Sequence, residues 1–235
     1  MSGSFLELPD GCVPADHSRQ QTCEAIVERF CREGIRFGRV LDLGCGDGRS
    51  IDFFRRVAPH AKWVGVDIEA SPEVRSRRRA DGEFHSFDGV HLPFADGDFD
   101  LVYCNQVFEH VRRPGPLLVE VARVLAREGR FIGSTSQLEC YHSYSYWNYT
   151  PFGFYTLLAE AGLRLVEMRP GIDALTLILR RIFRNHRFFE RFWTRPSPLN
   201  AWYDLAGRIR GRRHDEINAR KLLTCGQFCF VAVRA

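Results

Sequence analysis

The sequence predicts an α/β protein whose sheet is mostly parallel and covered by helices on both faces. Short apolar runs typical of buried strands alternate with segments of helical periodicity. The first such run ends in a glycine-rich turn, DLGCGDG. Two further strand-like runs near the C-terminus indicate a last strand that returns antiparallel beside its neighbour.

Length and composition fit one elaborated domain over residues 1–235, because 45% hydrophobic content provides one substantial core. The sequence has no run of eighteen apolar residues, so it predicts no transmembrane helix. The start, MSGSFLELPDG, lacks the basic and apolar regions of a signal peptide, so we expect a cytoplasmic protein. The eight cysteines are scattered and do not indicate a disulfide scaffold, and Cys225 and Cys229 are expected to be buried thiols.

Individual elements follow from periodicity and from capping residues. Ile26, Val27 and Phe30 recur at helical spacing, and Ser71-Pro72 has the form of an N-cap followed by proline at the first helical position. The predicted helices are residues 16–32, 49–57, 114–126 and 150–162, with another starting at Ser71-Pro72. The predicted strands are RVLDLGCG, KWVGVDI, FDLVYCN, GRFIGST, LRLVEMR and QFCFVAVRA.

The glycine turn predicts a nucleotide-like binding site. Gly44, Gly46 and Gly48 permit positive φ and close approach of a ligand, and the helix that follows presents free N–H groups. Their spacing differs from the dinucleotide pattern G-x-G-x-x-G. Asp42 would repel a pyrophosphate but could bind an ammonium group. The turn therefore favours a cofactor that carries both an amino group and a carboxylate.

Two later acids complete an ordered set of strand-end residues. Asp67 closes the second strand, where a carboxylate can accept both hydroxyls of a ribose. Asp88, before Gly89, could accept a hydrogen bond from an adenine amino group. Together with the turn, these residues predict an adenosine-containing cofactor more strongly than the glycines alone.

Three stretches resemble class I methyltransferases that use S-adenosylmethionine, of the subgroup called type 11. They are VLDLGCGDG, GVDI and FDGVHLPFADGDFDLVYCNQVFEHV, and the resemblance covers about residues 38–135, with a weaker match through residue 169. It implies a Rossmann-like seven-stranded sheet with an antiparallel last strand and S-adenosyl-L-methionine as cofactor. The implied contacts at the methionine end are Asp42, Gly44, Cys45, Gly46 and the backbone of Asn105. Those at the adenosine end are Asp67 for the ribose and Ile68, Asp88 and Gly89 for the adenine.

The acceptor side has two candidate bases. Methyl transfer from a sulfonium mainly requires alignment, but a hydroxyl acceptor must also lose its proton. His110 follows the fourth strand, where the family places substrate-facing groups, and its pKa suits a base near neutral pH. Glu109 could orient or replace it, and His142 is the alternative base. His110 could instead serve only in packing or capping.

Residues 136–150 are interpreted as the loop that forms the acceptor pocket. Aromatic rings with polar tips suit a sugar, a phenol or another small polar ring, and YWNYTPFGF resembles a stretch of methyltransferases from glycan pathways. The expected substrate contacts are Tyr141, Tyr146, Trp147 and Tyr149. The alternative is an aromatic loop that only covers the core.

Residues 170–224 are interpreted as a basic helical insert before the last strand. Residues 175–213 contain ten arginines and only two acids, and Leu175 to Trp193 place apolar residues at helical spacing. Such a basic amphipathic helix could contact the inner face of a membrane or form a lid over the active site. The alternative is an insert whose apolar face packs on the domain itself.

The sequence thus predicts an S-adenosylmethionine-dependent methyltransferase of a small molecule, through O-methylation of a sugar, glycan intermediate or other hydroxyl-bearing metabolite. Two alternatives stay open: an N- or C-methyltransferase of a natural-product or lipid-linked acceptor, and a non-catalytic cofactor-binding partner protein. A nicotinamide dehydrogenase is disfavoured by the glycine spacing and by Asp42. No nucleic-acid partner is expected, and no metal site is assigned because no His/carboxylate cluster has ligand spacing along the chain.

Overall fold

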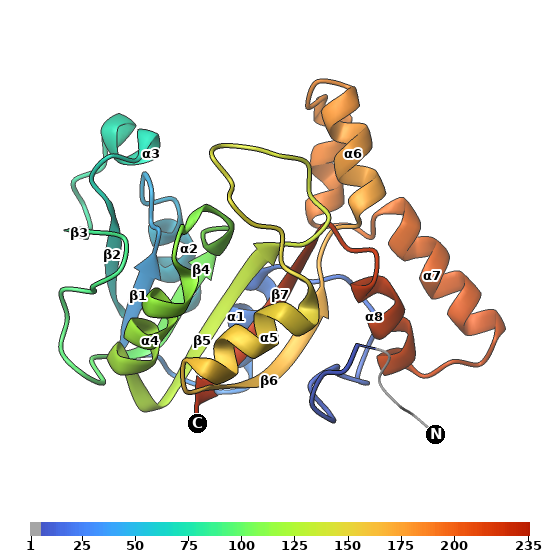
Figure 1. The fold of residues 1–235 in the computed structure, drawn as a ribbon, viewed down its shortest axis with the longest axis horizontal. Helices are drawn as coiled ribbons and strands as arrows, with labels where there is room; N and C mark the ends of the chain where they lie inside the picture. Colours follow the sequence, from blue (N-terminus) through green and yellow to red (C-terminus); the bar gives the residue numbers. More distant parts are fainter. Residues whose placement is uncertain (1–5) are drawn as a thin grey trace.

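The computed structural model describes residues 6–235 and contains a seven-stranded sheet in the order β3-β2-β1-β4-β5-β7-β6 (Figure 1). The first five strands in the chain pair in parallel, and β7 is antiparallel to both β5 and β6. This topology confirms the predicted fold class. Residues 1–5, the start of the segment without signal-peptide features, lie outside the described residues.

The strands are β1 Arg39–Leu43, β2 Lys62–Ile68, β3 Glu83–Phe87, β4 Phe99–Asn105, β5 Leu125–Ser136, β6 Leu163–Pro170 and β7 Gln227–Arg234. The α-helices are α1 Cys23–Arg32, α2 Ser50–Val57, α3 Pro72–Ser76, α4 Pro114–Val124, α5 Pro151–Glu160, α6 Ala174–Ile182, α7 Pro198–Ile209 and α8 His214–Leu222. Two short 3₁₀ helices are η1 Phe108–His110 and η2 Arg187–Trp193.

Local capping chemistry explains where several helices begin. The hydroxyls of Thr22, Ser71 and Thr150 each accept a hydrogen bond from a backbone N–H three residues later. Proline occupies the first turn of α3 and α5, where its missing N–H costs nothing. The predicted start of a helix at Ser71-Pro72 is therefore confirmed.

The N-terminal helix is shorter than predicted. It begins at Cys23 and not at residue 16, because the chain before Thr22 bonds to the sheet edge instead. Asp16 accepts a hydrogen bond of 2.8 Å from Arg169, and the Gln21 amide donates to the Pro170 carbonyl at 2.9 Å. These tertiary contacts override the local helical pattern.

Two other helix predictions need correction. The predicted helix 114–126 ends at Val124, because Leu125 already pairs with Phe99 of β4 as the first residue of β5. The predicted amphipathic helix from Leu175 to Trp193 breaks after α6. Arg184 and Asn185 have φ values of 52° and 60°, in the left-handed region, and separate α6 from η2.

The core has two parts, one on each face of the sheet. One part packs α1 and α2 onto the sheet through residues such as Ile26 and Phe54. The other packs α4 and α5 onto the opposite face through residues such as Leu118 and Phe154 (Figure 1). Both faces of the central strands are therefore buried, which explains their continuous apolar runs.

Between β6 and β7 the chain forms α6, η2, α7 and α8, and α6 and α7 project away from the sheet (Figure 1). Buried polar contacts attach this segment to the N-terminal region. Lys221 donates to Asp204 at 2.7 Å and to the Ser18 carbonyl, and Asn200 donates to Gln20 at 2.9 Å. Among residues 6–235, no helix has the length and apolar character needed to span a bilayer.

Substitution of Phe154 tests the core beneath the candidate site. Its fully buried ring contacts the rings of Phe108, Tyr149, Phe228 and Phe230. We expect Phe154→Ala to lower the free energy of unfolding by about 3–5 kcal/mol in urea titrations. Phe152→Ala removes a ring that is 46% exposed on the same helix and should cost far less. Equal losses in the two variants would contradict this packing.

Candidate functional site

The glycine turn after β1 lies at the edge of the sheet where the parallel strands end. Gly44, Gly46 and Gly48 all have positive φ, at 75°, 51° and 82°. A Cβ atom on Gly44 would lie 2.4 Å from a methyl group of Val107, so only glycine fits there. The amides of Gly44 and Cys45 donate to the Val66 carbonyl at 2.8 and 3.2 Å, which joins the turn to β2.

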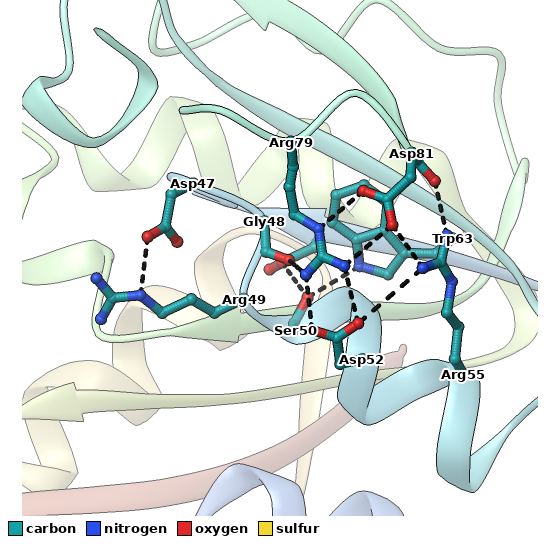
Figure 2. Close-up of polar contacts among 10 residues, drawn as sticks. Asp47, Gly48, Arg49, Ser50, Asp52, Arg55, Trp63, Arg79 and Asp81 are labelled. Atoms are coloured by element: carbon teal, nitrogen blue, oxygen red, sulfur yellow. Dashed lines mark hydrogen bonds and ion pairs between the residues drawn. The ribbon is translucent and has the colours of Figure 1, made fainter. Parts of the chain in front are cut away.

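A network of arginines and acids anchors the outer side of the turn (Figure 2). Arg79 donates to the Gly48 carbonyl at 3.3 Å and forms a bidentate pair with Asp52 at 2.8 Å. Asp81 accepts hydrogen bonds from both Arg79 and Arg55. Paired arginine donors hold the pKa of the Asp81 carboxyl below its ordinary value. The network restrains the turn from the segment that follows α3.

Arg77 is a site residue that the sequence reasoning missed. Its guanidinium donates twice to the Gly46 carbonyl, at 2.9 and 2.6 Å, and stacks 3.9 Å from the centre of the Phe84 ring. It also contacts the Cys45 sulfur at 3.6 Å. No signal in the sequence separates Arg77 from the neighbouring arginines, since its role depends on how α3 packs against the turn.

Asp67 and Asp42 border the turn from two strands. The Asp67 carboxylate accepts hydrogen bonds of 2.7 Å from the Gly46 and Ile68 amides, and burial raises its pKa above the ordinary value. Asp42 accepts a hydrogen bond from Ser50, and burial raises the pKa of Asp42 to about 7. Trp63 donates to the same Ser50 hydroxyl at 2.9 Å (Figure 2).

The residues predicted for an adenine lie beside the end of β2. Ile68 is 41% exposed and pairs with Phe87 of β3, so Asp88 and Gly89 follow close to it. A Cβ atom on Gly89 would lie 3.7 Å from Ile68. Asp88 accepts hydrogen bonds from the amides of Val90 and His91 and pairs with the His91 ring at 2.7 Å, which lowers the pKa of Asp88.

A cavity of about 320 Å³, lined by both polar and apolar residues, lies at the ends of β4 and β5. Asn105 lines it, accepting a hydrogen bond of 2.7 Å from Ser134 and donating to Glu24 at 3.4 Å. Other lining residues are Gln21, Gln106, Gly171, Trp193 and Gln227. Glu24 and Trp193 were not predicted as site residues, because α1 and η2 reach this edge of the sheet only in the folded chain.

The fold brings Glu109, His110 and His142 together beside this edge. One potential ligand atom from each lies within 4.8 Å of the other two. The rings of His110 and His142 are perpendicular with centroids 5.1 Å apart. Glu109 is fully buried, and burial raises its pKa to about 7. Burial and the neighbouring His142 lower the pKa of His110, which favours the neutral ring.

The absence of a His/carboxylate cluster, inferred from spacing along the chain, therefore needs correction. His142 is distant from Glu109 and His110 in sequence. The 136–150 loop brings it back, because the amides of Tyr146 and Trp147 donate to the Glu109 carbonyl at 2.7 and 3.2 Å. The cluster forms through this tertiary contact, which spacing alone cannot predict.

The aromatic residues of the loop divide into two groups. Tyr141, Tyr146 and Trp147 are exposed, and the Trp147 ring donates to the Val111 carbonyl at 2.9 Å. Tyr149 lies in the core, and its hydroxyl donates to the Phe108 carbonyl at 3.0 Å. The substrate contact predicted for Tyr149 is therefore replaced by a structural role in supporting η1.

Comparisons with known proteins find similarity to methyltransferases. Residues 41–133 match the family described as "Methyltransferase domain". The demethylmenaquinone methyltransferase of Thermotoga maritima is 36% identical over 48% of this chain and 48% of its own length. The fatty-acid O-methyltransferase of Mycolicibacterium smegmatis is 28% identical over 82% of this chain and 67% of its own length.

A solved S-adenosylmethionine-dependent methyltransferase from Mesorhizobium loti has the same fold, with a TM-score of 0.56 and 17% identity over 91% of this chain and 98% of that one. The chain spans about half the length or less of several curated relatives that it matches. The glycine turn and the strand-end acids all lie within the matched region. Residues 41–133 are thus a methyltransferase domain of the class I, type 11 family.

Proposed function

We propose that this chain is an S-adenosylmethionine-dependent methyltransferase acting on an oxygen atom of a small molecule. The observation that carries the proposal is the placement of the Asp67 carboxylate against the Gly46 amide, at 2.7 Å, beside the exposed Ile68. A carboxylate at the end of β2 is suited to the hydroxyls of a ribose, and an exposed isoleucine beside it is suited to a purine ring.

The residues around the turn fit this cofactor. Gly44 and Gly46 have the positive φ values that favour glycine, and their lack of side chains leaves the backbone open to a ligand. Asp42 supplies negative charge toward an ammonium group once it is deprotonated, and Asn105 borders the adjoining cavity. S-adenosylmethionine supplies a methyl group already activated on a sulfonium, so the protein's task is mainly to bind and orient.

The acceptor side supports an oxygen nucleophile. The adjoining cavity is lined by polar side chains such as Glu24, Gln106 and Gln227. The lowered pKa of His110 favours the neutral ring, which can accept the proton of a hydroxyl. The related enzymes are named for a quinone, a fatty acid and a malonyl-carrier-protein substrate. A sugar or glycan acceptor, an N- or C-methylation and a non-catalytic binding role stay as alternatives.

We also propose that α6 and α7 contact an anionic membrane surface. Both helices expose apolar side chains: Ile178 and Ile182 on α6, and Trp202, Leu205 and Ile209 at helical spacing on α7. Exposed arginines, including Arg181, Arg184, Arg187 and Arg208, lie on the same segment of the chain. Apolar insertion combined with basic charge is the pattern of helices that bind anionic lipid surfaces.

Asp67→Asn tests the cofactor site. Loss of one charged acceptor should weaken S-adenosylmethionine binding roughly tenfold or more in calorimetric titrations. Asp96→Asn alters an exposed acid paired with Arg123 and should leave the affinity unchanged. Methyl transfer to hydroxyl, amine and phenol acceptors is then screened with the wild-type chain. Binding of NADH in place of S-adenosylmethionine would overturn the proposal.

The raised pKa of Asp42 predicts a pH-dependent affinity. As the pH rises from about 6 to about 8, Asp42 loses its proton and its carboxylate attracts the cofactor's ammonium group. Wild-type affinity should therefore increase by up to about tenfold relative to that of Asp42→Asn over this range. Calorimetry in buffers of different ionisation enthalpy measures the released proton directly. A constant wild-type to variant ratio across the range would contradict the assignment.

Vesicle sedimentation tests the membrane contact. The chain should sediment with phosphatidylglycerol vesicles and not with phosphatidylcholine vesicles, and less of it should sediment at high salt. The double variant Ile182→Ala, Trp202→Ala should lose binding. Val119→Ala, which truncates an exposed residue on α4, is the control. Equal sedimentation with both lipids, or self-association of the chain through this surface, would count against a lipid partner.

A further inference from the structure

The cluster of Glu109, His110 and His142 has the composition of a metal-binding site. We propose that these residues bind one divalent transition-metal ion. Potential ligand atoms from all three lie within 4.8 Å of one another. Two ligands at about 2.1 Å from a common ion are roughly 3–4 Å apart, so the cluster needs only a small contraction to hold an ion.

The ring nitrogens of the two histidines are set up for ligation. His142 Nδ1 lies 3.2 Å from the Cys140 carbonyl, to which only a protonated nitrogen can donate. That tautomer leaves a lone pair on His142 Nε2. His110 Nδ1 is buried without a hydrogen-bond partner among the described residues, while the same ring forms a hydrogen bond with the Tyr144 backbone. An unpartnered buried nitrogen requires an explanation, and a metal ion supplies one.

The carboxylate is held in place by groups that do not ligate. Thr135 of β5 donates a hydrogen bond of 3.2 Å to one oxygen of Glu109, and the Ser136 hydroxyl lies 3.2 Å from the other oxygen. Outer contacts of this kind orient ligands in established metal sites. The loop amides that bond to the Glu109 carbonyl fix its backbone as well. Glu109 and His110 therefore lie on η1, beside the end of β5, and only His142 lies on the loop.

The surrounding charge also favours a cation. Glu139 is a second carboxylate beside the cluster. It accepts a hydrogen bond of 2.7 Å from the Ser136 hydroxyl, and it lies 3.9 Å from His142 Nδ1. The same hydroxyl contacts both Glu109 and Glu139. Two carboxylates this close repel each other unless one is protonated or a cation lies between them.

The ligand types narrow the choice of ion. Two imidazoles and one carboxylate suit zinc, iron(II), manganese(II) or cobalt(II), whereas magnesium and calcium prefer oxygen ligands alone. Three protein ligands leave coordination positions open. If the proposed function holds, an acceptor oxygen would occupy such a position, and the ion would favour its deprotonated form. With the ion bound, His110 would be a ligand, and the ion in place of His110 would promote loss of the acceptor's proton.

Metal titration of the chelator-stripped, dialysed chain tests the site directly. Cobalt(II) binding is followed by visible absorption and zinc(II) binding by calorimetry, each expected at one ion per chain. His142→Ala and the same-sized Glu109→Gln should each weaken binding roughly tenfold or more. His60→Ala removes an exposed histidine elsewhere and should have no effect. Circular dichroism checks that each variant is folded, and His142→Ala is expected to keep its fold because the residue lies on a loop.

The outcomes separate this site from the proposed cofactor site. Absence of cobalt binding by the folded wild-type chain would refute the proposal. Full binding by both variants would also refute it. The intense absorption of thiolate ligation would refute it too, because it would assign the ion to the free cysteines. S-adenosylmethionine affinity is measured on the same stripped protein. If that affinity is absent while the metal binds, the proposed function fails and the metal site stands.

Discussion

The hydrogen bond from the Gly46 amide to the Asp67 carboxylate joins the glycine turn to the end of β2, and the candidate cofactor site depends on it. The bond forms because β1 and β2 are parallel neighbours and end at the same edge of the sheet. Arg77 and Arg79 hold the turn from the opposite side through the Gly46 and Gly48 carbonyls. A turn restrained on both sides can present its free backbone groups without reorganising when a ligand binds.

The end of β5 joins the cofactor side to the acceptor side. Three consecutive hydroxyl residues, Ser134, Thr135 and Ser136, reach different partners: Ser134 bonds to Asn105 at the end of β4, and the other two bond to Glu109. Because β5 lies between β4 and β7 in the sheet, both contacts depend on the same rigid strand. The proposed cofactor site and the proposed acceptor site are thereby supported by the same strand of the sheet.

The parts that could be predicted from sequence are those governed by local signals. β2 and β4 have the predicted bounds because continuous apolar runs reflect burial on both faces. The helix starts at Ser71 and Thr150 follow from capping chemistry. The glycine turn and Asp67 are local features of a strand end, and they lie together in the structure as the sequence suggested.

The parts that could not be predicted depend on contacts between distant segments. Asp16 bonds to Arg169, and its segment is not helical although its sequence pattern predicts a helix. The break after α6 comes from two left-handed residues, Arg184 and Asn185, and only asparagine among them is a residue type that favours this region. The pairing of His142 with His110 exists only because the loop bonds to the Glu109 carbonyl.

A crystal structure of the chain with S-adenosylhomocysteine tests the central claim most directly. The account predicts both ribose hydroxyls within hydrogen-bond distance of the Asp67 carboxylate, the adenine against Ile68, and the amino-acid end over the turn at Gly44 and Gly46. Electron density for the molecule away from the ends of β1 and β2, with Asp67 still bonded only to backbone amides, would contradict it.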